Sequence, residues 1–96
     1  MIHAESIKAA QELLKERGIE QRENELWGDY VARGLDISSS QAETFLHALD
    51  ENRSIEEACR IAGISPDRQS ESLLVDLGRA IGNALGTLRK LPDTKS

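Results

Sequence analysis

Residues 65–91, SPDRQSESLLVDLGRAIGNALGTLRKL, decide the fold of this chain. Ser65 is a good helix cap, Pro66 fits a first helical turn, and the ring of Pro92 disfavours continuation beyond Leu91. Between these limits the apolar residues cover one arc of a helix: Leu73, Leu74, Leu77, Ala80, Ile81, Ala84, Leu85 and Leu88. The sequence therefore predicts one long amphipathic helix against which the other elements pack.

Three glycines lie beside this arc at intervals of four residues, with Val75 in line: Gly78, Gly82 and Gly86. Each glycine in a helix interior costs about 1 kcal/mol relative to alanine. Close approach of another helix is the physical feature expected to recover that cost. That helix belongs either to a second copy or to the same chain. The first alternative predicts a homodimer that associates through Val75, Gly78, Gly82 and Gly86.

Length and composition predict one helical domain spanning residues 1–96. Beta-branched residues are sparse, whereas Ala, Leu, Glu, Gln and Arg are plentiful, which favours an all-α fold of about five helices. The single cysteine excludes a disulfide within the chain. Glu5 and Lys8 stand where a signal peptide needs an apolar run, and no apolar run approaches the roughly 20 residues of a membrane span. A cytoplasmic protein without membrane contact is expected.

A pair of N-terminal helices is predicted within residues 4–33, ahead of the unit at 41–91 that contains the long helix. The first helix covers 4–17, after which Gly18 suits the left-handed conformation and Ile19 folds back on Leu14. The second covers 21–33 and ends at Gly34, with Gly28 inside it as a place of close backbone approach.

Two shorter helices are predicted before the long one. The third runs from about Gln41 to Asp50, after a capping box that begins at Ser38 or Ser40. The fourth runs from Ile55 to Ala62, with a capping box formed by Ser54 and Glu57 and with Gly63 at its end. Four of its residues are expected to face inward: Ala58, Cys59, Ile61 and Ala62.

The stretch from Ser54 to Ser65, SIEEACRIAGIS, joins a short helix with small inward residues to a turn glycine, an apolar residue and a capping serine. Together with the preceding helix it resembles the helix-turn-helix domain of small bacterial and phage regulators, over Gln41–Ser72. The resemblance implies a dimeric DNA-binding regulator. The residues placed to contact DNA are then Ser65, Arg68 and Gln69.

The next helix departs from that pattern. A recognition helix has apolar residues about six and nine positions after the turn glycine, where this chain has Gln69 and Ser72. Asp67 and Glu71 lie on the face that would meet DNA and would repel phosphates. The sequence therefore favours a helix-turn-helix kept as a scaffold over a working DNA reader.

Charge is distributed unevenly along the chain. Residues 1–50 contain five Lys or Arg against ten Asp or Glu, whereas residues 51–96 contain seven of each kind. The acidic half argues against broad contact with DNA or an anionic membrane and favours a basic protein partner. Trp27 and Tyr30 are candidate anchors for such a partner, with membership of the core as the alternative.

Residues that could bind a metal or act as a nucleophile are not grouped in the sequence. His3 and His47 are far apart and have no Cys or carboxylate at metal-ligand spacing, and Cys59 has no histidine near it. No catalytic residue, metal site or cofactor is therefore expected. The predicted function is that of a small non-enzymatic regulatory or adaptor protein that works through protein contacts, with the DNA-binding regulator as the alternative.

Overall fold

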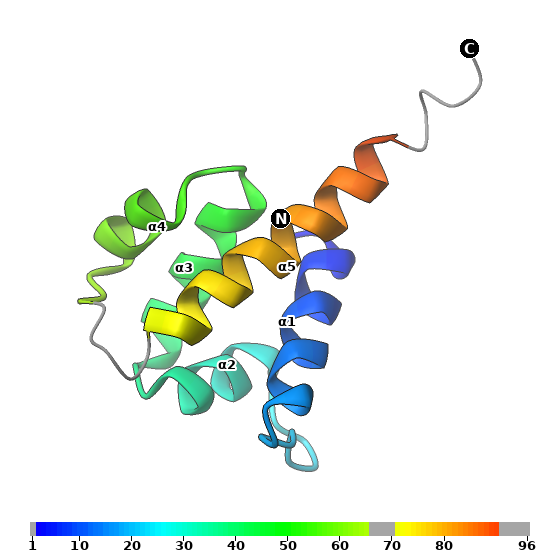
Figure 1. Cartoon of the computed structure of the whole chain (residues 1–96). Helices are drawn as coiled ribbons and strands as arrows, with labels where there is room; N and C mark the ends of the chain where they lie inside the picture. Colours follow the sequence, from blue (N-terminus) through cyan, green and yellow to red (C-terminus); the bar gives the residue numbers. More distant parts are fainter. Residues whose placement is uncertain (1, 66–70, 91–96) are drawn as a thin grey trace.

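The computed structural model describes residues 2–65 and 71–90, and the side chains of 87–90 are not part of that description. Within these ranges the chain forms five α-helices and no strand, which confirms the all-α prediction (Figure 1). The helices are α1 (Ala4–Glu16), α2 (Trp27–Leu35), α3 (Ser39–Asp50), α4 (Ile55–Ala62) and α5 (Glu71–Lys90).

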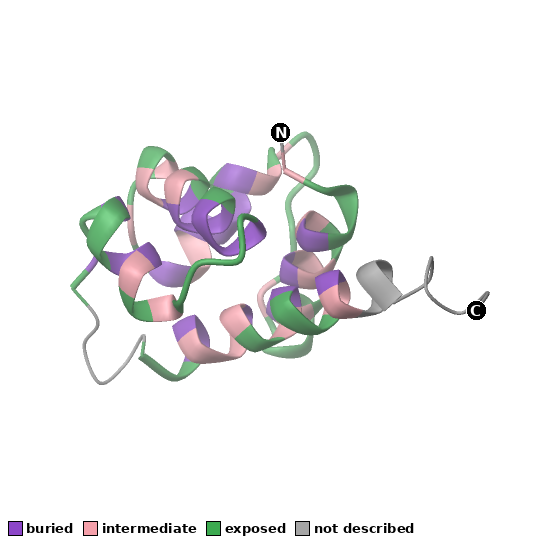
Figure 2. Ribbon diagram, turned by 90° about the horizontal axis from the view of Figure 1, so that it is seen from above, coloured by how far each residue is buried: buried purple, intermediate pink, exposed green. Residues whose placement is uncertain are grey.

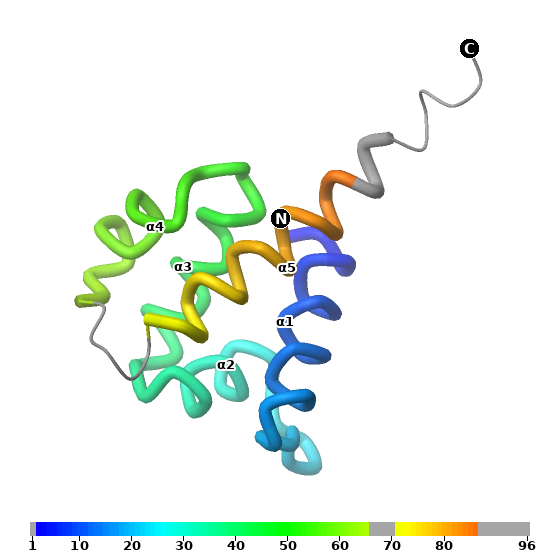
Figure 3. Tube along the Cα trace, in the orientation of Figure 1, coloured from blue at the N-terminus to red at the C-terminus, as the bar shows by residue number. Residues whose placement is uncertain are grey.

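Helix α5 packs most extensively along α1, so that elements from both ends of the chain lie side by side (Figures 1 and 3). An ion pair between Arg17 and Asp76 adds to this contact. Helix α3 packs on both α2 and α4, so these three helices form a second group beside the α1–α5 pair. The prediction that the other elements pack against the long helix is confirmed for α1, α3 and α4, whereas α2 packs mainly on α3 and α1.

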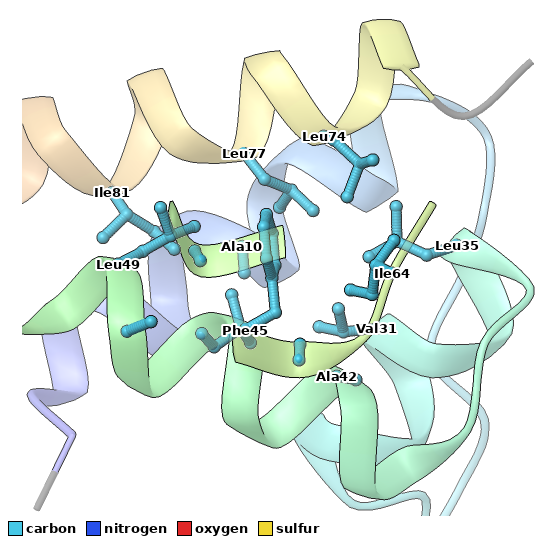
Figure 4. Close-up of a cluster of buried hydrophobic side chains, with 14 of the residues drawn as sticks. Ala10, Val31, Leu35, Ala42, Phe45, Leu49, Ile64, Leu74, Leu77 and Ile81 are labelled. Atoms are coloured by element: carbon cyan, nitrogen blue, oxygen red, sulfur yellow. The ribbon is translucent and has the colours of Figure 1, made fainter. Parts of the chain in front are cut away.

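The core draws residues from all five helices and lies beneath α5 (Figure 4). Leu74, Leu77 and Ile81 of α5 point toward Phe45 at its centre, which is fully buried. Figure 2 shows the same division on every helix, with buried faces turned inward and exposed faces outward. The predicted apolar arc is confirmed from Leu73 to Leu85, with Ala80 and Ala84 half-buried at its edge, and Leu88 lies outside the described side chains.

Two helix ends form as the glycine signals predict. Gly18 has a φ of +83°, and the N–H of Ile19 donates to the carbonyl of Leu14 at 3.0 Å. Gly63 has a φ of +71°, and the N–H of Ile64 donates to the carbonyl of Cys59 at 2.9 Å. Both glycines therefore reverse the chain and return an apolar residue toward the core.

The second helix begins later than predicted, at Trp27 instead of residue 21. Polar contacts hold residues 21–25 in a turn: the Glu25 carboxylate accepts from the Arg22 N–H at 2.9 Å, and the Gln21 side chain donates to the Glu25 carbonyl at 2.6 Å. Asn24 adopts a left-handed φ of +67°. Local side-chain bonding of this kind competes with helix formation.

Gly34 does not end this helix, contrary to the prediction. The helix continues to Leu35, and Asp36 adopts the left-handed conformation with a φ of +60°. Gly34 is needed for close packing, because a β-carbon there would lie 2.7 Å from Cδ2 of Leu14. Its role is to bring α2 against α1.

Serine caps begin α3 and α4. Ser38 and Gln41 form both bonds of a capping box, and α3 starts at Ser39, two residues earlier than predicted. The Ser54 hydroxyl accepts from the Glu57 N–H at 3.1 Å, but the Glu57 carboxylate pairs with Arg53, so the predicted box is only half formed. The predicted first turn of the long helix, residues 66–70, lies outside the described residues.

Candidate protein-contact surfaces

The glycines of α5 differ in how closely other atoms of the chain pack around them. A β-carbon on Gly78 would lie 2.5 Å from Cγ1 of Ile55 in α4, so this glycine packs against its own chain. For Gly78 the helix that approaches closely therefore belongs to the same chain, which is the second of the two alternatives. Val75 is half-buried and lines a hollow of about 310 Å³ between α4 and α5 together with Ile55.

Gly82 and Gly86 lie in open surroundings. Among the described residues, a β-carbon at either position would meet no heavy atom within 4 Å. Gly82 and its neighbours Arg79 and Asn83 are exposed, and Gly86 is half-exposed. These residues form a continuous outer surface of α5, which we call the glycine face: Arg79, Gly82, Asn83 and Gly86.

The residues predicted to contact DNA are described only in part. Ser65 is exposed after the turn at Gly63, whereas Arg68 and Gln69 lie outside the described residues. In the preceding helix pair α4 packs closely on α3, and Ile64 is buried behind the turn. Of the three predicted DNA contacts, Ser65 is thus the one that the described surface contains.

Of the two aromatic residues considered as partner anchors, Tyr30 belongs to the core. It is 1% exposed, its hydroxyl donates to the carbonyl of Ile19, and burial raises its pKa above 10.0. Trp27 is half-buried at the start of α2, where its ring lies 6.3 Å from the ring of His47 at a tilt of 55°. Only Trp27 retains surface that a partner can reach.

A second surface runs across the exposed side of α3. His47 lies near two apolar side chains, Trp27 and Ile61. Its ring packs beside the ring of Trp27, and together with Ile61 of α4 it lines a shallow hollow of about 330 Å³. Glu43 lies one helical turn before His47, lines the same hollow and covers Gly28 of α2. We call this surface the α3 outer face: Trp27, Glu43, His47 and Ile61.

The prediction that Ile61 faces inward is wrong, because its side chain is 49% exposed. Helix α4 is only about two turns long. Its buried side chains are Ala58, Cys59 and Ala62, and Ile61 lies at the edge of this buried face. An exposed β-branched residue beside a buried stripe is difficult to recognise from sequence, because the inward arc of a short helix is defined by few positions.

The most buried polar groups lie where the end of α3 meets the start of α1, around the carboxylate of Asp50. This carboxylate accepts hydrogen bonds from the Ser6 hydroxyl at 2.7 Å and from the His3 backbone N–H at 3.1 Å, and it pairs with the His3 imidazole at 3.0 Å. Burial acts to raise the pKa of Asp50, but the hydrogen bonds outweigh it and hold the pKa below 3.8.

This cluster is not arranged for nucleophilic chemistry. The Ser6 hydroxyl is fully buried and donates to Asp50, and the His3 imidazole bonds to the carboxylate and not to the serine hydroxyl. The carboxylate lies at the positive end of the α1 dipole, where a negative charge is favourable. The cluster therefore fastens α1 to α3.

Metal binding and membrane insertion find no support in the described residues. Among residues 2–65 and 71–90 no three His, Cys, Asp or Glu side chains gather as a metal site requires. In the same ranges no helix has the length and apolar character needed to cross a membrane.

No protein-family model, curated protein or solved structure matches this chain. Its function is therefore inferred from its own residues and their geometry.

Proposed function

We propose that this chain is a small, cytoplasmic, non-enzymatic regulatory or adaptor protein that acts through protein contacts and pairs with a second copy through α5. The observation that carries the proposal is the open glycine face. A β-carbon added to Gly82 or Gly86 would have no heavy atom of the described residues within 4 Å, whereas the corresponding space at Gly78 is filled by Ile55. The same helix thus packs one glycine against its own fold and leaves two without such a neighbour.

Exposed glycines in a helix are costly. An alanine in place of either exposed glycine would favour the helix by about 1 kcal/mol, and neighbouring atoms do not prevent it at Gly82. A second helix at close range would recover this cost, because glycine allows two backbones to approach. Arg79 and Asn83 flank the glycines and offer hydrogen-bond donors at the rim.

Sedimentation equilibrium of the full chain tests this proposal. We expect a dimer at concentrations of tens of micromolar. Gly82→Gln places a long polar side chain in the glycine face and should shift the chain to monomer. Ser72→Gln, on an exposed position near the start of α5, is the matched control and should leave the dimer intact. A wild-type chain that is monomeric throughout the concentration series rules out pairing through α5.

A second candidate function is DNA binding by the helix-turn-helix-like unit. The observation that favours it is the α3–α4 pair itself, with Gly63 in the left-handed conformation and Ile64 buried behind it. Duplex DNA titrated at about 50 to 200 mM salt tests it, because phosphate contacts give affinity that falls steeply with salt. Arg68→Ala and Gln69→Ala should each cost about 1–3 kcal/mol for every base that the side chain reads. Absence of binding at the lowest salt rejects this function.

A further inference from the structure

The α3 outer face combines exposed apolar surface with carboxylates. We propose that it binds a basic segment of a partner protein that presents an aliphatic side chain between lysines or arginines. This inference rests on the proposed function, because an adaptor needs a partner surface besides the one used for self-association.

The apolar part of the surface is provided by Ile61 and Trp27. Ile61 is 49% exposed at the edge of the hollow beside α3, and the ring of the half-buried Trp27 lies 6.3 Å from the ring of His47, which lines the same hollow. The hollow of about 330 Å³ is wide enough to receive one aliphatic side chain. A half-buried tryptophan with an accessible surface is the type of residue that anchors protein contacts.

The polar part of the surface has a net negative charge. Glu43, Glu51 and Arg53 line the hollow, which gives two carboxylates against one guanidinium. Arg53 pairs with Glu51 at 3.3 Å and with Glu57 at 3.1 Å, so its charge is shared between two carboxylates. Among the ion pairs of the described residues none involves Glu43, whose carboxylate therefore offers a partner for an incoming cation.

Charge complementarity selects a basic partner over a second copy at this surface. Two copies that paired symmetrically would bring together two patches of the same net negative charge. Like charges that meet across an interface oppose binding. A lysine- or arginine-containing segment instead places cations beside these carboxylates and its aliphatic side chain against Ile61.

Trp27 is the single tryptophan of the chain and lies on this surface, so its fluorescence reports directly on occupancy. The probe is a synthetic amphipathic peptide of leucine and lysine, and a peptide of leucine and glutamate with the same pattern is its control. We expect a saturable change in Trp27 emission with the lysine peptide, weakened by added salt, and no change with the glutamate peptide.

Two variants locate the binding. Glu43→Gln should weaken the lysine peptide about threefold, as for one exposed ion pair, and Ile61→Ser should weaken it about fivefold or more. Glu12→Gln, an equal change of charge on the outer side of α1, should leave the affinity unchanged. Circular dichroism of each variant verifies that the helices are retained.

Four results would overturn the inference: no response of Trp27 to the lysine peptide, equal binding of both peptides, unchanged affinity in both Glu43→Gln and Ile61→Ser, or emission that changes with protein concentration alone. The last would assign the surface to a second copy. Pairing through Gly82 without any response of Trp27 to the lysine peptide contradicts this inference and leaves the self-association intact. A monomeric chain that still binds the lysine peptide contradicts the self-association and leaves this inference intact.

Discussion

Gly78 of α5 and Ile55 of α4 pack so closely that a β-carbon on Gly78 would lie 2.5 Å from Cγ1 and 2.6 Å from Cδ1 of the isoleucine. This contact joins the long helix to the shortest helix of the described residues and shapes their mutual approach. Gly82, one turn further along α5, has no such neighbour. Two glycines of one line thus have opposite structural roles.

Gly78→Ala should therefore destabilise the fold, while Gly82→Ala should stabilise it. The added methyl at position 78 overpacks against Ile55, which costs about 1–3 kcal/mol and outweighs the gain in helix propensity. At position 82 the gain of about 1 kcal/mol is unopposed within the monomer. Urea denaturation of each variant, at a protein concentration where the chain is monomeric, measures both changes.

A double-mutant cycle attributes the effect to the pair. In the Gly78→Ala background, Ile55→Ala should cost less than it does in the wild-type chain, because the smaller side chain makes room for the methyl. Additive effects of the two substitutions would show that the destabilisation arises elsewhere.

Asp50→Ala should destabilise the chain by about 1–3 kcal/mol, because it leaves the buried Ser6 hydroxyl without its acceptor. Ser6→Ala should cost less, since the carboxylate keeps its bonds from His3. Thermal unfolding followed by circular dichroism compares the two. A cost for Ser6→Ala above that for Asp50→Ala would show that packing of the small side chain, and not the carboxylate, holds α1 to α3.

Acid should weaken the fold through Glu25. Hydrogen bonds from Arg33 and from the Arg22 backbone lower the pKa of Glu25 from 4.5 to about 2. Its stabilising effect is therefore complete above pH 4.5 and is lost as the pH falls toward about 2. Glu25→Gln should flatten the stability curve across this window. Carbon-13 NMR of the side-chain carboxyl gives the pKa directly, and a midpoint near 4.5 would contradict the ion pair with Arg33.

Cys59 should react slowly with a disulfide reagent such as DTNB in the native chain. Its side chain is 4% exposed, and burial raises the pKa of the thiol above 9.0, so little thiolate is present at neutral pH. The rate should rise sharply when urea unfolds the chain. Fast labelling without denaturant would mean that α4 opens readily from the core.

Local signals in the sequence predicted much of the fold. The apolar arc of the long helix, the left-handed glycines at positions 18 and 63 and the serine caps at positions 38 and 54 depend on residues within a few positions of one another. Short-range sterics and hydrogen bonding decide such features. The sequence accordingly predicted an all-α chain, with α1 and α4 near their observed limits.

Contacts between particular side chains decided the late start of α2 and the role of Gly34. Polar bonds within residues 21–33 hold the segment before α2 in a turn, and Arg33 reaches back to Glu25 at 2.9 Å. Gly34 meets Leu14 of another helix, a partner that periodicity cannot identify because it depends on how the chain returns on itself.

For the candidate surface residues too, part of the answer came from the sequence and part from the tertiary structure. From sequence alone, Gly78, Gly82 and Gly86 formed one equivalent line and Trp27 and Tyr30 formed one pair of anchors. The fold separates them: Ile55 covers Gly78, and the core encloses Tyr30, while Gly82 and Trp27 remain accessible. The residue types and their helical spacing were thus determined by the sequence itself. Which of them face solvent was decided by the tertiary structure, because exposure depends on neighbours that lie far away along the chain.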